Sequence, residues 1–167
     1  MSGLGRRSIS WNVEAYGPAA CGLITLALLW VYRGSILPLM MVDKLSVSNL
    51  CTAVFGWASI QTGCVFAIYG FVAGKNDGFI GEARQTRSMK RYNAYIKRAI
   101  WTGFLLTLTS MPLIVWKFVP AEIDMIIFAL LSLWFSIFVW AFLSFARVAF
   151  IFGILIQINE SDRIGAG

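Results

Sequence analysis

Histidine is absent from this 167-residue sequence, and charged residues make up only 13% of it. Without histidine the chain lacks the usual haem ligand, the commonest zinc ligand and the usual general base. The three cysteines, Cys21, Cys51 and Cys64, do not have the C-x-x-C spacing of metal or redox sites, so we interpret them as small packing residues. The sequence therefore predicts a protein that is not an enzyme and that has no cofactor.

Aspartate and glutamate are missing from four long apolar stretches, at about residues 17–33, 47–74, 99–119 and 125–147. Apolar residues are 59% of the chain. Runs of about 20 such residues cross a bilayer as helices, because a helix satisfies its own backbone hydrogen bonds. The sequence predicts an all-α polytopic membrane protein, a four-transmembrane-helix bundle in a single membrane domain over residues 1–167.

The basic residues are distributed unevenly between the two sides of this predicted bundle. Seven of the 14 lie between Lys75 and Arg98, and placing that segment inside also puts Arg6, Arg7, Arg147 and Arg163 inside. Only Arg33, Lys44 and Lys117 remain outside. The positive-inside rule then predicts that both termini are cytoplasmic, and we expect a bacterial inner membrane.

Prolines interrupt two of the hydrophobic segments. Between Gly34 and Ser46, Pro38 argues against a continuous helix, and we expect this connection to lie on the outer surface. Pro112 is expected to bend the third span, with nearby Ser and Thr hydroxyls bonding the carbonyl that it frees. The negative charge of Glu122 and Asp124 is favourable at the start of the fourth span.

Small residues recur along the second span at intervals of three and four, which places them on one helical face. They are Thr52, Gly56, Ser59, Gly63, Ala67, Gly70 and Gly74. Small residues let helices approach closely in lipid, so this face predicts a helix-packing or oligomer interface. Packing within the monomer, self-association and a ligand or lipid groove are the three alternatives.

Polar side chains accompany this face, namely Asn49, Gln61 and Thr62. Gln61 is the most costly of them to leave facing lipid, because a buried amide needs a hydrogen-bond partner. It either bonds a neighbouring helix or faces a water-filled lumen.

The segment at about 81–98 is predicted to be a helix joined to the third span, with Met89, Tyr92 and Ile96 on one side. Its basic side carries Arg84, Arg87, Lys90, Arg91, Lys97 and Arg98. Such a face suits anionic lipid headgroups, an acidic protein surface or nucleotide phosphates, or it acts only as a topology signal. No motif for nucleic acid accompanies it.

Arg147 is the only charge in the fourth hydrophobic run, which continues as an apolar extension over residues 148–158. It lies either at the cytoplasmic interface or within the bilayer, where it would be a candidate functional charge. The extension would pack under the basic helix or against another subunit. If it meets the basic helix, the two form a collar above the bundle.

Three functional hypotheses follow from these patterns. A small homo-oligomeric channel or pore is favoured, and a non-conducting accessory or assembly subunit of a larger membrane complex is the main alternative. A small transporter using Glu14, which precedes the first span, ranks third. The expected partners are the bilayer with its anionic headgroups and either a second copy or a larger complex.

Overall fold

The computed structural model describes residues 3–42, 44–74, 86–116, 119 and 123–165, with the backbone alone for 3–15 and 158–165. Every element in this part of the chain is a helix, which confirms the all-α prediction there. The helices are α1 (Gly3–Val31), α2 (Arg33–Met41), α3 (Val47–Gly74), α5 (Arg87–Val115) and α6 (Met125–Gly165). The predicted calls at Lys75, Arg84 and Glu122 lie outside the described residues.

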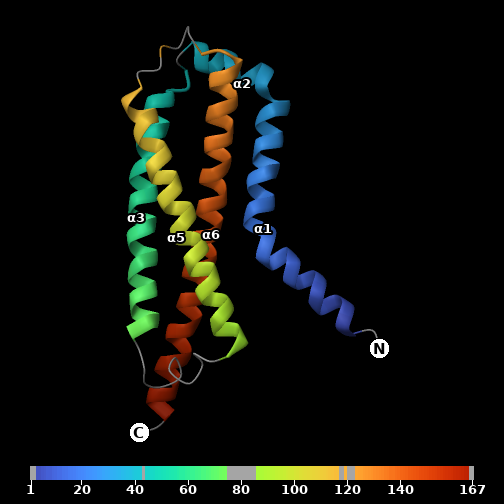
Figure 1. Cartoon of the computed structure of the whole chain (residues 1–167), viewed down its shortest axis with the longest axis vertical. Helices are drawn as coiled ribbons and strands as arrows, with labels where there is room; N and C mark the ends of the chain where they lie inside the picture. The colour runs from blue at the N-terminus through green and yellow to red at the C-terminus, as the bar shows by residue number, and fades with distance from the viewer. Residues whose placement is uncertain (1–2, 43, 75–85, 117–118, 120–122, 166–167) are drawn as a thin grey trace.

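Within the described residues, three helices, α3, α5 and α6, are long and apolar enough to cross a membrane. A fourth span results if α1 from Tyr16 and α2 are counted together, although the two are bent by 74°. Figure 1 shows the long helices side by side, with α2 at one end and the start of α1 and the end of α6 at the other. The first part of α1 turns outward where Pro18 lies inside the helix, as expected for a proline that breaks the backbone ladder.

Side-chain caps explain where the last two long helices begin. The Thr86 hydroxyl accepts a hydrogen bond from the Met89 backbone nitrogen at 3.3 Å, so the basic segment is helical from Arg87 onward. Asp124 accepts from the nitrogens of Ile126 and Ile127 at 3.0 and 2.8 Å. The predicted role of Asp124 at the helix start is therefore confirmed as an N-cap.

The expectation of broken helix around Pro38 was wrong. Helix α2 runs continuously through Pro38, because the proline removes only the bond that its nitrogen would have donated to the Gly34 carbonyl. The break occurs instead at Tyr32, between α1 and α2.

Pro112 likewise lies inside α5, which ends three residues later at Val115 rather than near 119. The hydroxyls of Thr107 and Ser110 bond the carbonyls of Gly103 and Leu106, at 2.9 and 2.7 Å. They therefore do not bond the Leu108 carbonyl that the proline frees, contrary to expectation.

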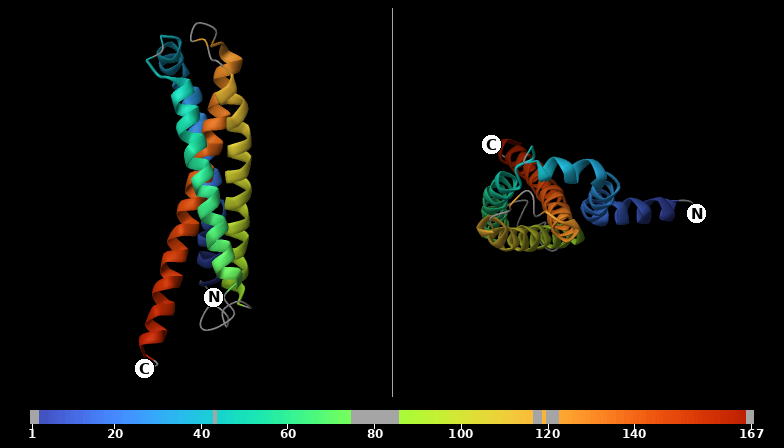
Figure 2. Two further views of the ribbon diagram at one scale, coloured as in Figure 1. Left: turned by 90° about the vertical axis from the view of Figure 1, so that its left-hand side faces the viewer. Right: turned by 90° about the horizontal axis from the view of Figure 1, so that it is seen from above.

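The helices pack mainly as three pairs, α3 on α5, α1 on α6 and α5 on α6, and of these α1 and α6 lie far apart in the sequence. Figure 2 shows α3, α5 and α6 as a triangle seen from above, with α1 beside α6 and α2 crossing the end of the bundle. Trp57 of α3 contacts α6 through Phe138, Phe142 and Phe145, with ring centroids 5.0 to 6.0 Å apart.

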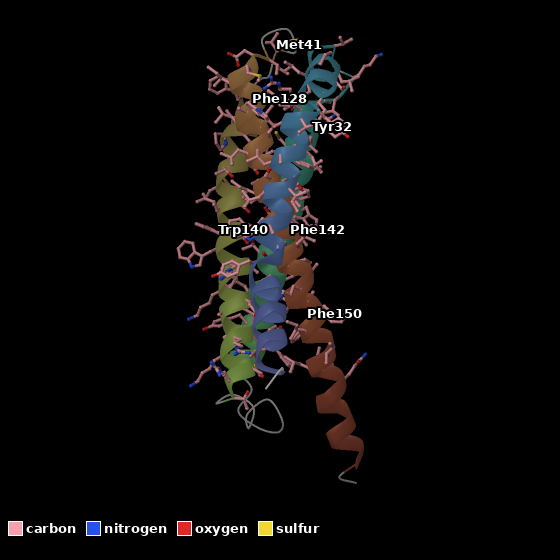
Figure 3. All side chains as sticks on the ribbon, turned by 90° about the vertical axis from the view of Figure 1, so that its right-hand side faces the viewer. Tyr32, Met41, Phe128, Trp140, Phe142 and Phe150 are labelled. Carbon is pink, nitrogen blue, oxygen red and sulfur yellow. The ribbon has the colours of Figure 1, made fainter. Side chains whose placement is uncertain are left out.

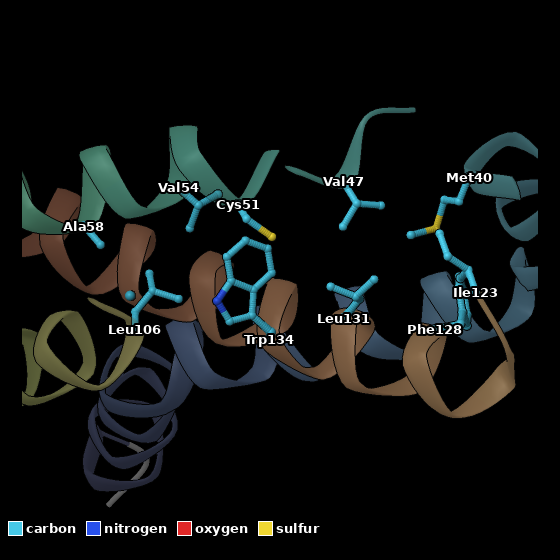
Figure 4. Close-up of a cluster of buried hydrophobic side chains, with 11 residues drawn as sticks. Met40, Val47, Cys51, Val54, Ala58, Leu106, Ile123, Phe128, Leu131 and Trp134 are labelled. Carbon is cyan, nitrogen blue, oxygen red and sulfur yellow. The ribbon is translucent and has the colours of Figure 1, made fainter. Parts of the chain in front are cut away.

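Two clusters of buried apolar side chains fill the space between the helices. The first core cluster lies toward α2 and includes Met40, Cys51, Phe128 and Trp134 (Figure 4). Its Trp134 indole donates a hydrogen bond to the Ser110 hydroxyl at 3.1 Å. The second core cluster lies toward the termini and joins α3, α5 and α6. Figure 3 places Phe128 of the first core cluster at the α2 end of the bundle.

Candidate functional site

Helix α3 presents one continuous face to the rest of the protein. Its buried residues recur at alternating intervals of four and three, as in a heptad seam: Val47, Cys51, Val54, Ala58, Gln61, Val65, Ile68 and Val72. Both core clusters draw on this face. The fold of the monomer is therefore built on one side of α3.

The predicted small-residue face lies on the opposite side, about 170° around the helix at 3.6 residues per turn. All seven of its residues are exposed: Thr52, Gly56, Ser59, Gly63, Ala67, Gly70 and Gly74. A Cβ atom added at any of the four glycines would meet nothing within 4 Å. The alternative in which this face packs inside the monomer is therefore wrong, and the face remains open to another molecule.

The hydroxyl groups on the exposed face of α3 are satisfied by their own helix. Thr52 donates to the Ser48 carbonyl at 3.0 Å, and Ser59 donates to the Phe55 carbonyl at 2.9 Å. Such bonds let a hydroxyl lie in an apolar environment without an unpaired donor. The exposed face is thus compatible with lipid or with a second helix at the same depth.

The predicted polar residues of α3 separate into different environments. Gln61 is buried, and its amide nitrogen donates to the Ala141 carbonyl of α6 at 3.2 Å, which confirms the interhelical alternative. Its amide oxygen is buried without a hydrogen-bond partner in the described part of the chain. Thr62 donates to the Ala58 carbonyl at 2.7 Å, and Asn49 is exposed. Gln61 therefore acts in packing and not in a lumen of the monomer.

The basic side of α5 faces outward, as the sequence pattern requires. The side chains of Arg87, Lys90, Lys97 and Arg98 are exposed and Arg91 is half-buried, while Arg84 lies outside the described residues. The opposite side is buried: Met89, Tyr92 and Ile96 belong to the second core cluster. A cationic surface is thus carried by a helix that is anchored along its apolar side.

The apolar extension of α6 packs against this basic helix. Val148 is fully buried in the second core cluster, and its carbonyl accepts a hydrogen bond from the Tyr92 hydroxyl at 3.2 Å. Ile151 and Leu155 pack against the same cluster, and Ile158 lies outside the described side chains. The packing on which the collar hypothesis depends is therefore present, and we call the two packed segments, residues 87–98 and 148–155, the collar.

Arg147 directly precedes Val148 on α6, at the edge of this collar. Its guanidinium carbon is 3.6 Å from the centre of the Tyr95 ring, a close cation–π contact. The two residues line a cleft between α1, α5 and α6 together with Pro18, Arg98, Trp140 and Ser144. The cleft encloses about 10 Å³, room for roughly one water molecule. Glu14, the predicted transport carboxylate, lies outside the described side chains.

Two glycines that the sequence reading missed lie where neighbouring helices approach closely. A Cβ at Gly103 of α5 would lie 2.6 Å from the Thr62 hydroxyl of α3. A Cβ at Gly22 of α1 would lie 3.0 Å from the Ser136 carbonyl oxygen of α6. The spacing of Ala99 and Gly103, four residues apart and both buried, is a signal that could have found the first of them.

The cysteines and acidic residues of the described part of the chain lie apart from one another. Within the described residues no group of three or more such side chains could hold a metal ion. Cys51 packs in the first core cluster, whereas Cys21 and Cys64 are exposed. Comparison with protein-family models, with curated proteins and with solved structures found no match.

Proposed function

We propose that this chain functions as a homo-oligomeric membrane protein whose copies meet at the small-residue face of α3. The observation that carries the proposal is that all seven residues of that face are exposed in the single chain. Each glycine inside a helix costs about 1 kcal/mol relative to alanine in the propensity scales. The cost of four glycines on one outward face is offset when another helix packs closely against them.

A second copy of the chain is the partner that fits this face best. Each copy carries the same face, so two α3 helices related by symmetry offer each other the same close approach. The buried seam of α3 stays intact on the other side. Assembly therefore needs no rearrangement of the monomer.

We further propose that α1 with α2, α3, α5 and α6 form four spans, with the collar and both termini in the cytoplasm. The charge distribution supports this orientation, since the basic side of α5 lies at the collar end. Arg98 and Arg147, which line one cleft, then mark the inner edge of the bilayer. A bacterial inner membrane is the proposed location.

Conduction is the candidate activity of such an assembly. The two apolar clusters occupy the space between helices within one chain, so the proposed path lies between copies. The exposed face of α3 favours this placement because it carries the Thr52 and Ser59 hydroxyls beside glycines. Without charged rings, the pore would be weakly selective.

The mass of the detergent-solubilised protein tests the proposed self-assembly. We expect a closed oligomer for the native chain and smaller species for Gly63→Leu, because a bulky side chain would hold the α3 helices apart. Ala27→Leu, which places the same leucine side chain at an exposed position of α1, should leave the mass unchanged. A native chain that stays monomeric and copurifies with unrelated membrane proteins would support the accessory-subunit alternative.

Cysteine cross-linking tests the location of the interface. In a chain with Cys21 and Cys64 changed to alanine, Gly56→Cys should form a disulfide-linked dimer on oxidation in membranes. The matched control is Leu108→Cys, an exposed position on α5 that should not form one. Cross-linking at Leu108 but not at Gly56 would contradict the proposal and would place the interface on α5. Ion flux into liposomes, abolished by Gly63→Leu, would then assign conduction to the oligomer.

A further inference from the structure

A large apolar groove lies at the α2 end of the bundle, away from the small-residue face of α3. It has a volume of about 300 Å³ and lies between α1, α2, α3 and α6. Its walls come from Leu29 of α1, Ile36 and Met40 of α2, Leu50 of α3, and Leu131 and Phe135 of α6. We name it the α2 groove.

The bend between α1 and α2 creates the groove. Helix α1 packs on α6, and the 74° turn at Tyr32 carries α2 over the end of the bundle toward α3. The side of α6 that lies between α1 and α3 is then roofed by α2. Phe128 and Leu131 on this side of α6 belong to the first core cluster, so the groove floor is part of that core.

Water is a poor occupant of the α2 groove. Its volume has room for many water molecules, each of which needs two to four polar partners. Among the described side chains that line it, only Ser132 is polar. At membrane depth the material available to fill such a space is hydrocarbon.

Two cations flank α2, the helix that forms the roof of the groove. Arg33 begins α2, one helical turn before the lining residue Ile36, and its guanidinium lies 5.3 Å from the centre of the Trp30 ring. Lys44 directly precedes the lining residue Leu45. Both side chains are exposed, as expected for groups that attract a phosphate at the bilayer surface.

We propose that the α2 groove holds one acyl chain of a membrane phospholipid, whose headgroup phosphate is bound by Arg33 and Lys44. The acyl chain matches the apolar walls and the phosphate matches the two cations. The lipid fills the space between α1 and α3 and thereby supports the bent end of the bundle.

Photocrosslinking in vesicles tests this lipid site. The protein is reconstituted in phosphatidylcholine that contains a minor fraction carrying a diazirine in its acyl chain, and labelled peptides are identified after irradiation. We expect label around Leu131 and Phe135 in several-fold excess over Leu105, an exposed position on α5. Equal labelling at both places would show that lipid contacts the groove no more than any other exposed surface, and it would overturn the proposal.

A matched pair of variants on α1 tests whether the groove itself is occupied. Leu29→Trp fills the groove and should lower the label on α6 several-fold, whereas Leu28→Trp, at the neighbouring exposed position, should not. Unchanged label in Leu29→Trp overturns the proposal. No label in the native chain also overturns it, and indicates a protein segment in the groove.

Two measurements keep this test independent of folding and of self-assembly. Native mass spectrometry of the unmodified chain should show a retained phospholipid, and Arg33→Gln with Lys44→Gln should reduce that retention, unlike Lys90→Gln at the far end of the bundle. Equal retention of phospholipid by the Arg33 and Lys44 variant and by the Lys90 variant would show that Arg33 and Lys44 do not bind the phosphate. Since Gly63→Leu leaves the groove intact, its label should persist even where self-assembly fails.

Discussion

Replacing Gln61 with leucine tests how a buried amide contributes to this fold. Only 1% of the Gln61 side chain is exposed, and it makes one interhelical bond of 3.2 Å to the Ala141 carbonyl. The amide oxygen has no partner among the described residues. Leucine has a similar size and removes both polar groups at once.

The two effects have opposite signs. A hydrogen bond between membrane helices contributes about 0.6 kcal/mol on average and about 1.7 kcal/mol at most. A buried polar atom without a partner costs about 1–3 kcal/mol. The Ala141 carbonyl keeps its own bond within α6, so leucine leaves no new unpaired group. We therefore expect Gln61→Leu to raise the free energy of unfolding by about 1 kcal/mol.

Alanine at the same position separates packing from polarity. Gln61→Ala removes the same polar groups but also leaves a cavity between α3, α5 and α6, and truncating a large buried side chain to alanine costs about 2–5 kcal/mol. The alanine variant should therefore be less stable than the leucine variant by roughly 2–4 kcal/mol. Ile60→Leu, at a position 70% exposed, should change stability by less than about 0.5 kcal/mol.

Reversible unfolding in mixed detergent and dodecyl sulfate micelles, followed by tryptophan fluorescence, measures these differences. A loss of about 2 kcal/mol or more in Gln61→Leu would refute the reasoning, because that loss exceeds the largest expected hydrogen bond. It would mean that the Gln61 amide oxygen has a hydrogen-bond partner in the membrane and that the amide stabilises the fold.

Two further predictions concern other close contacts. Gly22→Ala should lower the melting temperature in detergent, because its Cβ would lie 3.0 Å from the Ser136 carbonyl oxygen, whereas Gly17→Ala meets open space and should not; equal melting of the two would contradict the close approach of α1 and α6. Tyr92→Phe should lower the free energy of unfolding by about 1 kcal/mol, since it removes the bond to Val148, and faster hydrogen exchange should be confined to the collar; an unchanged collar would show that this bond is not formed.

The long helices could be predicted from the sequence because they combine apolar length with recognisable ends. Asp124 marks the start of α6, and the apolar stripe through Tyr92 placed the basic segment on a helix that packs. The bend at Tyr32 could not be predicted in the same way. Pro38 is the obvious interruption in that region, but the proline is accommodated and the break depends on how α2 folds back over the bundle.

The direction of each face was harder to predict than its existence. In water an apolar stripe points inward, but in lipid both the inside and the outside of a bundle are apolar. The glycine spacing of α3 therefore indicated a packing surface, but it did not indicate whether that surface packs within the monomer or against another molecule. Gly22 shows the converse, because a single glycine without a repeat gives no spacing signal even though it makes a very close contact.

The two sides of α3 allow folding and assembly to be separated. The helix has 28 residues, about 42 Å, which exceeds the hydrocarbon core of about 30 Å, and its last turns pack in the second core cluster through Ile68 and Val72. Gly70 and Gly74 follow on the outer side of these same turns, so the proposed interface continues from the bilayer into the collar. Substitutions of Val65 on the buried side should therefore change the unfolding free energy at any protein concentration. Substitutions of Gly63 on the outer side should change only the oligomer size. A Gly63 variant whose monomer is unfolded would contradict this separation, because it would show that the monomer is stable only within the oligomer.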